Sequence, residues 1–228
     1  MEISVSLDPS VNKDLENYVN YMNGVLLSIN EGRLSYHVDI MDGQLVERAA
    51  VSMSEYGFIT TTSKLPMDVH LMINKPQDRI EEYFNAPKLK YNGGVRSITF
   101  HVEALPRYEA KKLLQKIQKS GFKGGVAIDL DTPVTATGIQ ELIEKSDVVL
   151  IMSVKAGKSG QVFSMGGLRK VQQVKRINPG IRVILDGGVN RDNIEMIKKA
   201  GVDTVVVGNY IYSSEDKKAT ILNLVRLA

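Results

Sequence analysis

Hydrophobic and polar positions alternate in short runs along most of the chain, and each run is followed by a loop and a stretch with helical periodicity. Runs rich in β-branched residues predict strands, whereas apolar residues spaced three and four positions apart predict amphipathic helices. The predicted strands are residues 3–7, 35–40, 67–72, 97–101, 125–128, 148–152, 182–186 and 204–207. The pattern therefore predicts a regular succession of strand and helix.

Two of the helices between these strands have clear end signals. Residues 107–119 form a helical pattern that ends before Gly121, a residue suited to the turn after a helix. Asp192 is expected to cap a short helix over residues 193–200, which Gly201 then ends.

Strand and helix alternate throughout, and no Pro- or Ser-rich linker interrupts them. This order predicts an α/β fold with a parallel sheet. Eight βα units suit one (β/α)8 TIM barrel that spans residues 1–228 as a single domain. A doubly wound open sheet is the alternative architecture.

Composition narrows the functional classes. The net charge is +3 without a run of like charges, which weakly favours an anionic small molecule and gives no support for a nucleic-acid partner. The absence of cysteine excludes disulfides, thiolate metal sites and a cysteine nucleophile. No stretch approaches about eighteen apolar residues and the first residues lack a signal-peptide pattern, so we expect no membrane partner and a cytoplasmic location.

Residues with acid, base or ligand chemistry gather at the ends of the predicted strands. In a (β/α)8 barrel these carboxyl ends meet at the face that carries the chemistry. His37 and Asp39 share one face of their strand, because alternate side chains point the same way. The full set is His37, Asp39, His70, His101, Glu103 and Asp186.

Two imidazoles and two carboxylates at one mouth would form a mixed nitrogen and oxygen ligand set. Such a set suits one Zn²⁺, Fe²⁺, Mn²⁺ or Co²⁺ ion better than Ca²⁺. The alternative for any one of these residues is structural, for example a polar strand edge that faces water.

Glycine-rich loops follow the later strands, where barrels commonly bind phosphate groups. The residues AGKS at 156–159 resemble the end of a nucleotide P-loop, but Met152 stands where that motif needs glycine. We therefore expect a phosphate group but not a nucleotide. The candidate substrate-binding residues in these loops are Gly157, Lys158, Ser159, Gly160, Gly187, Gly188, Gly208 and Asn209.

Three methionines, Met41, Met72 and Met152, lie at or just beyond strand ends. One interpretation is ordinary filling of the core by an adaptable side chain. The other is an apolar lid that excludes water from a reactive intermediate.

Several motifs in the right order resemble the ribulose-phosphate 3-epimerase family: HVDIMDG, DVHLM, ITFHVEA, LIMSV followed by a glycine loop ending in GQ, and LDGG. The resemblance spans nearly the whole chain, from ISVSL to VVVGNYIY. It implies a metal-dependent isomerase that epimerises D-ribulose 5-phosphate to D-xylulose 5-phosphate. Family habit also suggests a homo-oligomer.

The resemblance assigns roles to particular residues. It implies that His37, Asp39, His70 and Asp186 bind the metal, and that Asp39 and Asp186 also act as acid and base. It further implies that His70 and a serine of the first strand contact the substrate, and Ser4 is a better match than Ser6. With four ligands assigned, we expect His101 to support them from outside the metal's coordination shell.

Some loops depart from the family pattern. Gln44 and the Glu47-Arg48 pair replace a histidine and a Pro-Asn pair, Ala156, Lys158 and Ser159 alter the glycine loop, and Asp129-Leu130 replaces an Asn/Lys-Pro pair. Two alternatives stay open: the same chemistry on another ketose phosphate such as allulose 6-phosphate, and a barrel that binds a sugar phosphate without turnover. A metal-free decarboxylase of similar fold would need a lysine beside Asp39, which this chain lacks.

Overall fold

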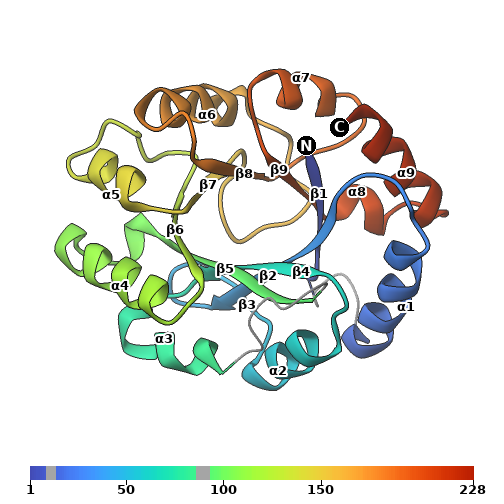
Figure 1. Ribbon diagram of the computed structural model, residues 1–228, viewed down its shortest axis with the longest axis horizontal. Coiled ribbons are helices and arrows are strands. Elements are labelled where there is room, and N and C mark those ends of the chain that lie inside the picture. Colours follow the sequence, from blue (N-terminus) through green and yellow to red (C-terminus); the bar gives the residue numbers. More distant parts are fainter. Residues whose placement is uncertain (9–13, 86–92) are drawn as a thin grey trace.

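The computed structural model describes residues 1–8, 14–85 and 93–228. Its central feature is a barrel of parallel strands with helices around the outside (Figure 1). The strands are β1 (Glu2–Ser6), β2 (Leu34–Asp42), β3 (Ala49–Ala50), β4 (Pro66–Met72), β5 (Gly94–His101), β6 (Lys123–Ile128), β7 (Val148–Met152), β8 (Arg182–Asp186) and β9 (Thr204–Val207). All of them except β3, which pairs antiparallel with β2, belong to the parallel barrel.

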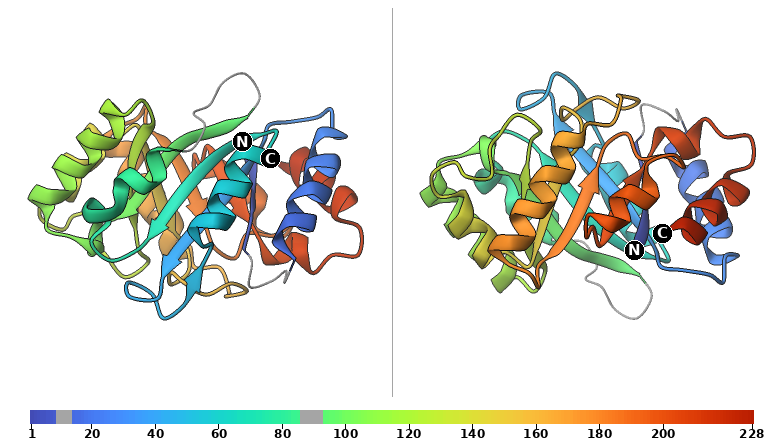
Figure 2. Two further views of the ribbon diagram at one scale, coloured as in Figure 1. Left: turned by 90° about the horizontal axis from the view of Figure 1, so that it is seen from below. Right: turned by 90° about the horizontal axis from the view of Figure 1, so that it is seen from above.

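Helices connect successive strands and cover the outer face of the barrel (Figure 2). Within the described ranges, none has the length and apolar character needed to cross a bilayer. The helices are α1 (Leu15–Leu27), α2 (Met53–Thr62), α3 (Pro76–Phe84), the 3₁₀ helix η1 (Val102–Ala104), α4 (Arg107–Lys119), α5 (Ile139–Lys145), α6 (Met165–Ile177), α7 (Ile194–Lys199), α8 (Asn209–Tyr212) and α9 (Lys217–Leu227).

The sheet is closed because β1 pairs with strands from both ends of the chain. It runs parallel to β2, with Ser6 opposite His37, and parallel to β9, with Val5 opposite Val207. An open, doubly wound sheet would leave its edge strands unpaired. The predicted (β/α)8 barrel is therefore confirmed, and the open-sheet alternative is excluded.

Most predicted element ends agree with the structure, but one predicted cap is wrong. The helix predicted over 107–119 coincides with α4, and Gly201, with a φ of +89°, follows the short helix α7 as expected. Asp192 does not cap α7. Instead, the Asn193 side chain accepts a hydrogen bond from the backbone N–H of Asn190 at 2.9 Å, which fixes the turn before the helix.

The barrel interior has an apolar half and a polar half. Alternate residues of β6 to β9 point inward and form a small apolar cluster that includes Leu150, Ile184 and Val206, while their neighbours pack outward against the helices. The strands β1, β2, β4 and β5 instead bury polar residues at inward positions, among them Ser35 and Thr99. The polar side chains of this half continue to the carboxyl ends of the strands.

At the opposite, amino-terminal end of the barrel, the polar half ends in a partly buried ion-pair cluster. Arg96 binds Glu2 and Asp68, and Arg182 binds the same two carboxylates at 3.2 and 2.8 Å. Burial alone would raise the pKa of Asp68, but Arg182 and Arg96 outweigh it and hold that pKa well below its usual range. The cluster therefore stays ionised at neutral pH.

Asp68→Asn is expected to lower the free energy of unfolding by about 2–4 kcal/mol at pH 7, because it leaves two partly buried guanidinium groups with one carboxylate. Since the folded pKa of Asp68 is depressed, this stabilisation is present above the unfolded pKa and is lost as pH falls below about 4. Urea unfolding of wild type and variant should show a difference that is constant above about pH 5 and shrinks progressively as pH falls below about 4. A variant as stable as wild type at pH 7 would contradict a stabilising role for the cluster.

Candidate active site

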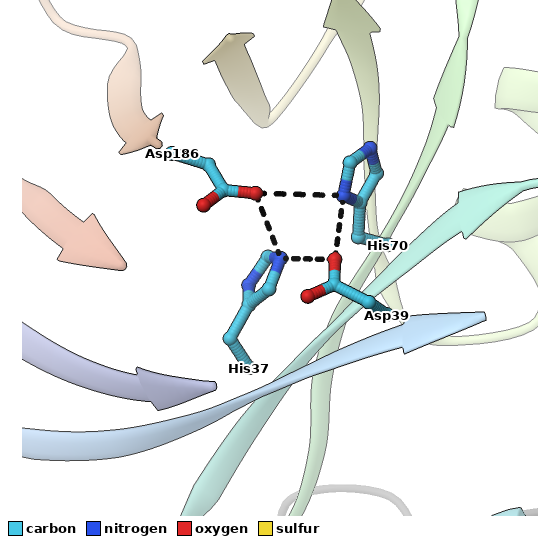
Figure 3. Close-up of side chains that lie close together, drawn as sticks. All are labelled: His37, Asp39, His70 and Asp186. Carbon is cyan, nitrogen blue, oxygen red and sulfur yellow. Dashed lines mark hydrogen bonds and ion pairs between the residues drawn. The ribbon is translucent and has the colours of Figure 1, made fainter. Parts of the chain in front are cut away.

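Four side chains with ligand chemistry converge at the carboxyl ends of the barrel strands (Figure 3). His37 and Asp39 come from alternate positions of β2, His70 comes from β4, and Asp186 is the last residue of β8. One polar atom of each lies within 4.8 Å of the others. The structure thus brings together the four residues predicted as metal ligands.

The spacing of these atoms suits a small cation. Asp39 Oδ1 lies 3.2 Å from His37 Nε2 and 3.0 Å from His70 Nδ1, and Asp186 Oδ2 lies 3.9 and 4.0 Å from the same two nitrogens. Bonds of about 2.0–2.2 Å to a tetrahedral ion would place ligand atoms roughly 3.4 Å apart. The four groups surround a space of that size.

His37 provides an independent sign that the site is built for a ligand. Its ring is fully buried, yet among the described residues neither ring nitrogen makes a hydrogen bond, although Nε2 lies 3.2 Å from Asp39 Oδ1. A buried polar group left in this way costs about 1–3 kcal/mol. A cation bound by Nε2 would satisfy it, so the residues present fit a divalent metal ion.

The pKa shifts of the four residues also favour a bound cation. Burial alone would lower the pKa of His37, but the Asp39 carboxylate raises it to about 9. Burial and the charge of Asp39 raise the pKa of Asp186, whereas the two histidines outweigh burial and hold the pKa of Asp39 low. Burial lowers the pKa of His70, which keeps that ring neutral as a metal ligand must be.

A cavity of about 390 Å³ opens directly above the cluster, and both aspartates line it. Ser6, at the end of β1, also lines the cavity and donates a hydrogen bond to Asp39 Oδ2 at 3.2 Å. After β7, the Ser153 hydroxyl donates to the carbonyl oxygens of Asp186 and Gly187 at 2.8 and 2.6 Å. The Asp39 carboxylate and the backbone that carries Asp186 are therefore held in place at the wall of the cavity.

The predicted glycine loops form another part of the cavity wall. Gly157 has a φ of +92°, and a Cβ atom there would lie 2.6 Å from Val46 Cβ, so only glycine lets these two loops meet. All eight loop residues predicted to bind the substrate line the cavity: Gly157, Lys158, Ser159, Gly160, Gly187, Gly188, Gly208 and Asn209. The three methionines, Met41, Met72 and Met152, line it as well. Their role as a water-excluding lid stays a prediction.

Some predicted residues lie behind the cavity wall. His37 and His70 are fully buried and face the aspartates from below. Ser4 is also fully buried and does not line the cavity, so Ser6 is the better-placed serine for a substrate contact. His101 lies outside the four-residue cluster, with its Nε2 at 2.9 Å from His70 Nε2. That position fits the predicted supporting role.

Two charged residues of the cavity wall were not among the predicted site residues. Asp8 follows β1, and its carboxylate receives a hydrogen bond from Arg48 at 2.9 Å. The position of Asp8 just beyond a strand end was an available signal. Arg48 was visible only as a departure from the family motif, and of the altered residues 44, 47 and 48 it is the one that lines the cavity.

Comparison with known proteins identifies the family. The model of the ribulose-phosphate 3 epimerase family matches residues 7–212. The chain belongs to this family. The predicted resemblance is confirmed, and with it the expectation of an enzyme of the epimerase class, which are isomerases.

Curated relatives within the ribulose-phosphate 3-epimerase family cover most of the chain. The ribulose-phosphate 3-epimerase of Aquifex aeolicus is 34% identical over 204 residues, which are 88% of this chain and 87% of the relative. The protein of the same name from Helicobacter pylori is 36% identical over 192 residues, 82% of this chain and 83% of the relative. The altered loops therefore lie within a match that covers most of each relative.

Solved structures of lower sequence identity share the barrel. The tryptophan synthase α-subunit of Pyrococcus furiosus is similar with a TM-score of 0.69 at 14% identity, covering 99% of this chain and 97% of that one. A 3-hexulose-6-phosphate synthase is similar with a TM-score of 0.62 at 16% identity, covering 100% and 99%. These likenesses concern the fold alone.

Proposed function

We propose that this chain is a metal-dependent 3-epimerase of a ketose phosphate, with D-ribulose 5-phosphate and D-xylulose 5-phosphate as its substrate pair. The observation that carries the proposal is the position of Asp39 and Asp186, which line one cavity beside two buried imidazoles. Membership of the ribulose-phosphate 3-epimerase family supports the same reaction.

Epimerisation at C3 needs two acid/base groups on opposite faces of the substrate. The proton on C3 is acidic because the carbon lies beside a ketone, and removal of the proton gives a planar enediolate. Asp39 on β2 and Asp186 on β8 reach the cavity from different strands. One carboxylate removes the proton, and the other delivers a proton to the opposite face.

His37, Asp39, His70 and Asp186 would hold one divalent ion, Zn²⁺, Fe²⁺, Mn²⁺ or Co²⁺. When bound, such an ion supplies Lewis-acid stabilisation of negative charge on the oxygens at C2 and C3. The buried His37, whose Nε2 lies beside Asp39 but makes no hydrogen bond to any described residue, supports this assignment.

The remaining cavity wall suits the rest of the substrate. The glycine loops after β7, β8 and β9 would bind the phosphate group through their backbone, so that remote binding energy positions C3 between the two aspartates. The methionines would exclude water, and Ser6 is the further candidate for substrate contact, since Ser4 and His70 lie behind the cavity wall. Cytoplasmic location and a homo-oligomeric state stay predictions.

A substrate panel tests the proposal. The chain, loaded separately with Zn²⁺, Mn²⁺ or Fe²⁺, is offered ribulose 5-phosphate, allulose 6-phosphate and other pentulose and hexulose phosphates, and the products are followed by NMR. We expect the highest kcat/KM for ribulose 5-phosphate. Preference for a hexulose 6-phosphate would move the proposal to that substrate, for which the altered cavity residue Arg48 provides a reason. If the metal-loaded forms bound these compounds but converted none of them, the non-catalytic barrel would be supported instead.

A further inference from the structure

Arg48 places a positive charge in the wall of the candidate active-site cavity. Its guanidinium Nη2 donates to the Asp8 carboxylate at 2.9 Å and lies 3.6 Å from Met41 Sδ. Met41 stands two positions after Asp39 on β2, so these two side chains point to the same face of the strand. All four residues line the cavity. The guanidinium therefore lies beside the side chain that follows Asp39 on this face of β2.

The loop that carries Arg48 meets the glycine loop that follows β7. A Cβ atom on Gly157 would lie 2.6 Å from Val46 Cβ, so the two backbones approach closely at this point. One residue further along each loop, Glu47 Oε2 lies 3.5 Å from Lys158 Nζ. Arg48 thus follows directly on a segment that touches backbone expected to bind phosphate.

The loop after β9 approaches the same ion pair from the side of β1. A Cβ atom on Gly208 would lie 3.5 Å from Ser6 Cβ, which is ordinary van der Waals contact. Asp8 comes two residues after Ser6, and both side chains line the cavity. Each partner of the Arg48–Asp8 ion pair therefore belongs to a segment that adjoins a glycine loop.

The charges of the cavity wall leave few groups that can attract an anion. Of the described residues that line the cavity, Asp8, Asp39 and Asp186 are acidic, and only Arg48 and Lys158 are basic. The Lys158 side chain is 71% exposed, and exposed ion pairs of flexible side chains contribute little. The side chains of Arg48 and Asp8 are 28% and 7% exposed. Arg48 is therefore the basic residue of the wall that is held in position and shielded from water.

We propose that Arg48 is a specificity-determining residue that binds the phosphate group of the substrate, with Asp8 holding its guanidinium in place. This inference rests on the proposed function, because it takes a ketose phosphate as the substrate. The phosphate is the part of such a substrate that carries charge. A guanidinium has five N–H donors in one plane and can bind two phosphate oxygens in parallel, so it can serve a carboxylate and a phosphate together.

A side-chain cation at this place changes what the site selects. Backbone N–H groups of the glycine loops would bind phosphate by hydrogen bonds alone, whereas Arg48 adds a full charge to the same end of the substrate. A ketose without phosphate gains nothing from that charge. We therefore expect Arg48 to strengthen binding of phosphorylated ligands and to leave the binding of free ketoses unchanged.

The main variant for testing this inference is Asp8→Asn/Arg48→Met, which removes the ion pair as a whole. It leaves no buried carboxylate without its arginine, and it keeps the net charge of the cavity wall, so that a loss of phosphate affinity reports on the guanidinium itself. Arg48→Gln is the second variant, because its amide can still donate to Asp8. Arg169→Met, the same chemical change at an exposed position of α6 outside the cavity wall, is the matched control.

Three ligands are titrated into each folded protein: inorganic phosphate, D-ribulose 5-phosphate and unphosphorylated D-ribulose. Affinities are measured by calorimetry and by NMR, and thermal unfolding checks the fold. We expect wild type and Arg169→Met to bind each ligand equally. The double variant should bind inorganic phosphate and D-ribulose 5-phosphate about 10–100-fold more weakly, as loss of a hydrogen-bonded charged group predicts, and its affinity for D-ribulose should not change.

A folded double variant that binds inorganic phosphate as tightly as wild type would overturn the inference. An equal loss of affinity for D-ribulose and D-ribulose 5-phosphate would overturn it as well, because the contact would then not be to the phosphate. Should the double variant not fold, the same comparisons are made with Arg48→Gln.

The two proposals fail in different ways. If wild type bound D-ribulose 5-phosphate through Arg48 but converted none of it with any metal, the epimerase function would fail and the role of Arg48 would stand. Epimerisation by wild type together with phosphate affinities that do not depend on Arg48 would refute the present inference alone.

Discussion

Replacing Asp39 or Asp186 with asparagine is expected to abolish interconversion of the two epimers, with a loss of at least about 10²–10⁴-fold in rate. Each carboxylate serves one face of C3, so neither can replace the other. Asparagine keeps the size of the side chain but cannot accept the proton. The two variants should therefore fold and bind substrate while losing the reaction.

The two variants should differ in solvent exchange. A variant that retains one carboxylate can still remove the C3 proton of the epimer whose hydrogen faces it, and can return a deuteron to that same face. Deuterium wash-in from D₂O, followed by NMR for each epimer separately, should show exchange without inversion. The epimer that exchanges in Asp39→Asn should be the one that does not exchange in Asp186→Asn.

Metal content must be controlled in this comparison, because both aspartates belong to the candidate metal cluster. Each variant is reloaded with metal and its content measured before the rates are compared. Asp131→Asn, the same chemical change at an exposed position that does not line the cavity, is the matched control and should keep the wild-type rate. Near wild-type interconversion by a metal-replete variant of either aspartate would rule out the two-base mechanism.

His70→Ala is expected to lose the metal. The substitution removes one of four ligand groups and leaves the two carboxylates with His37 alone. The affinity should fall by more than the roughly 10–100-fold that loss of a supporting partner costs. Elemental analysis of protein purified without chelator should find about one metal ion per chain in wild type and far less in the variant.

The affinity of the wild-type site should also depend on pH in a defined direction. A proton on His37, whose pKa the Asp39 carboxylate raises to about 9, competes with the cation for the same nitrogen. Zn²⁺ binding should therefore strengthen as pH rises toward 9.

Equal metal content in His70→Ala and wild type, with both proteins folded, would be strong evidence against the site.

Much of the fold could be predicted because the hydrophobic pattern that marks each strand or helix lies within a short stretch of sequence. The apolar runs of β7, β8 and β9 coincide with the predicted strands, since buried parallel strands are nearly continuous in hydrophobicity. The polar interior of β1, β2, β4 and β5 was harder to foresee, because polar alternation does not say whether a face meets water or another buried group. The ion pairs of Arg96 and Arg182 became visible only with the strand ends side by side.

The candidate site, like the fold, could be predicted only in part from the sequence. Residues at strand ends with distinctive chemistry, such as His37 and Asp186, could be selected from the sequence. Ser4 and Ser6 share a face of one strand, and which of them reaches the cavity depends on how deep each layer lies, which the sequence does not state. The contact between Arg48 and Asp8 joins two loops whose conformations local patterns do not determine.

The closure of the barrel by β1 has a consequence for synthesis on the ribosome. Ile3 pairs with Val205, about two hundred positions later, so one edge of β1 cannot be satisfied until β9 has left the exit tunnel. An unpaired strand edge is a template for association with other chains, and long-range parallel pairing is slow. The nascent chain must therefore carry an open barrel until β9 has been synthesised and released from the tunnel.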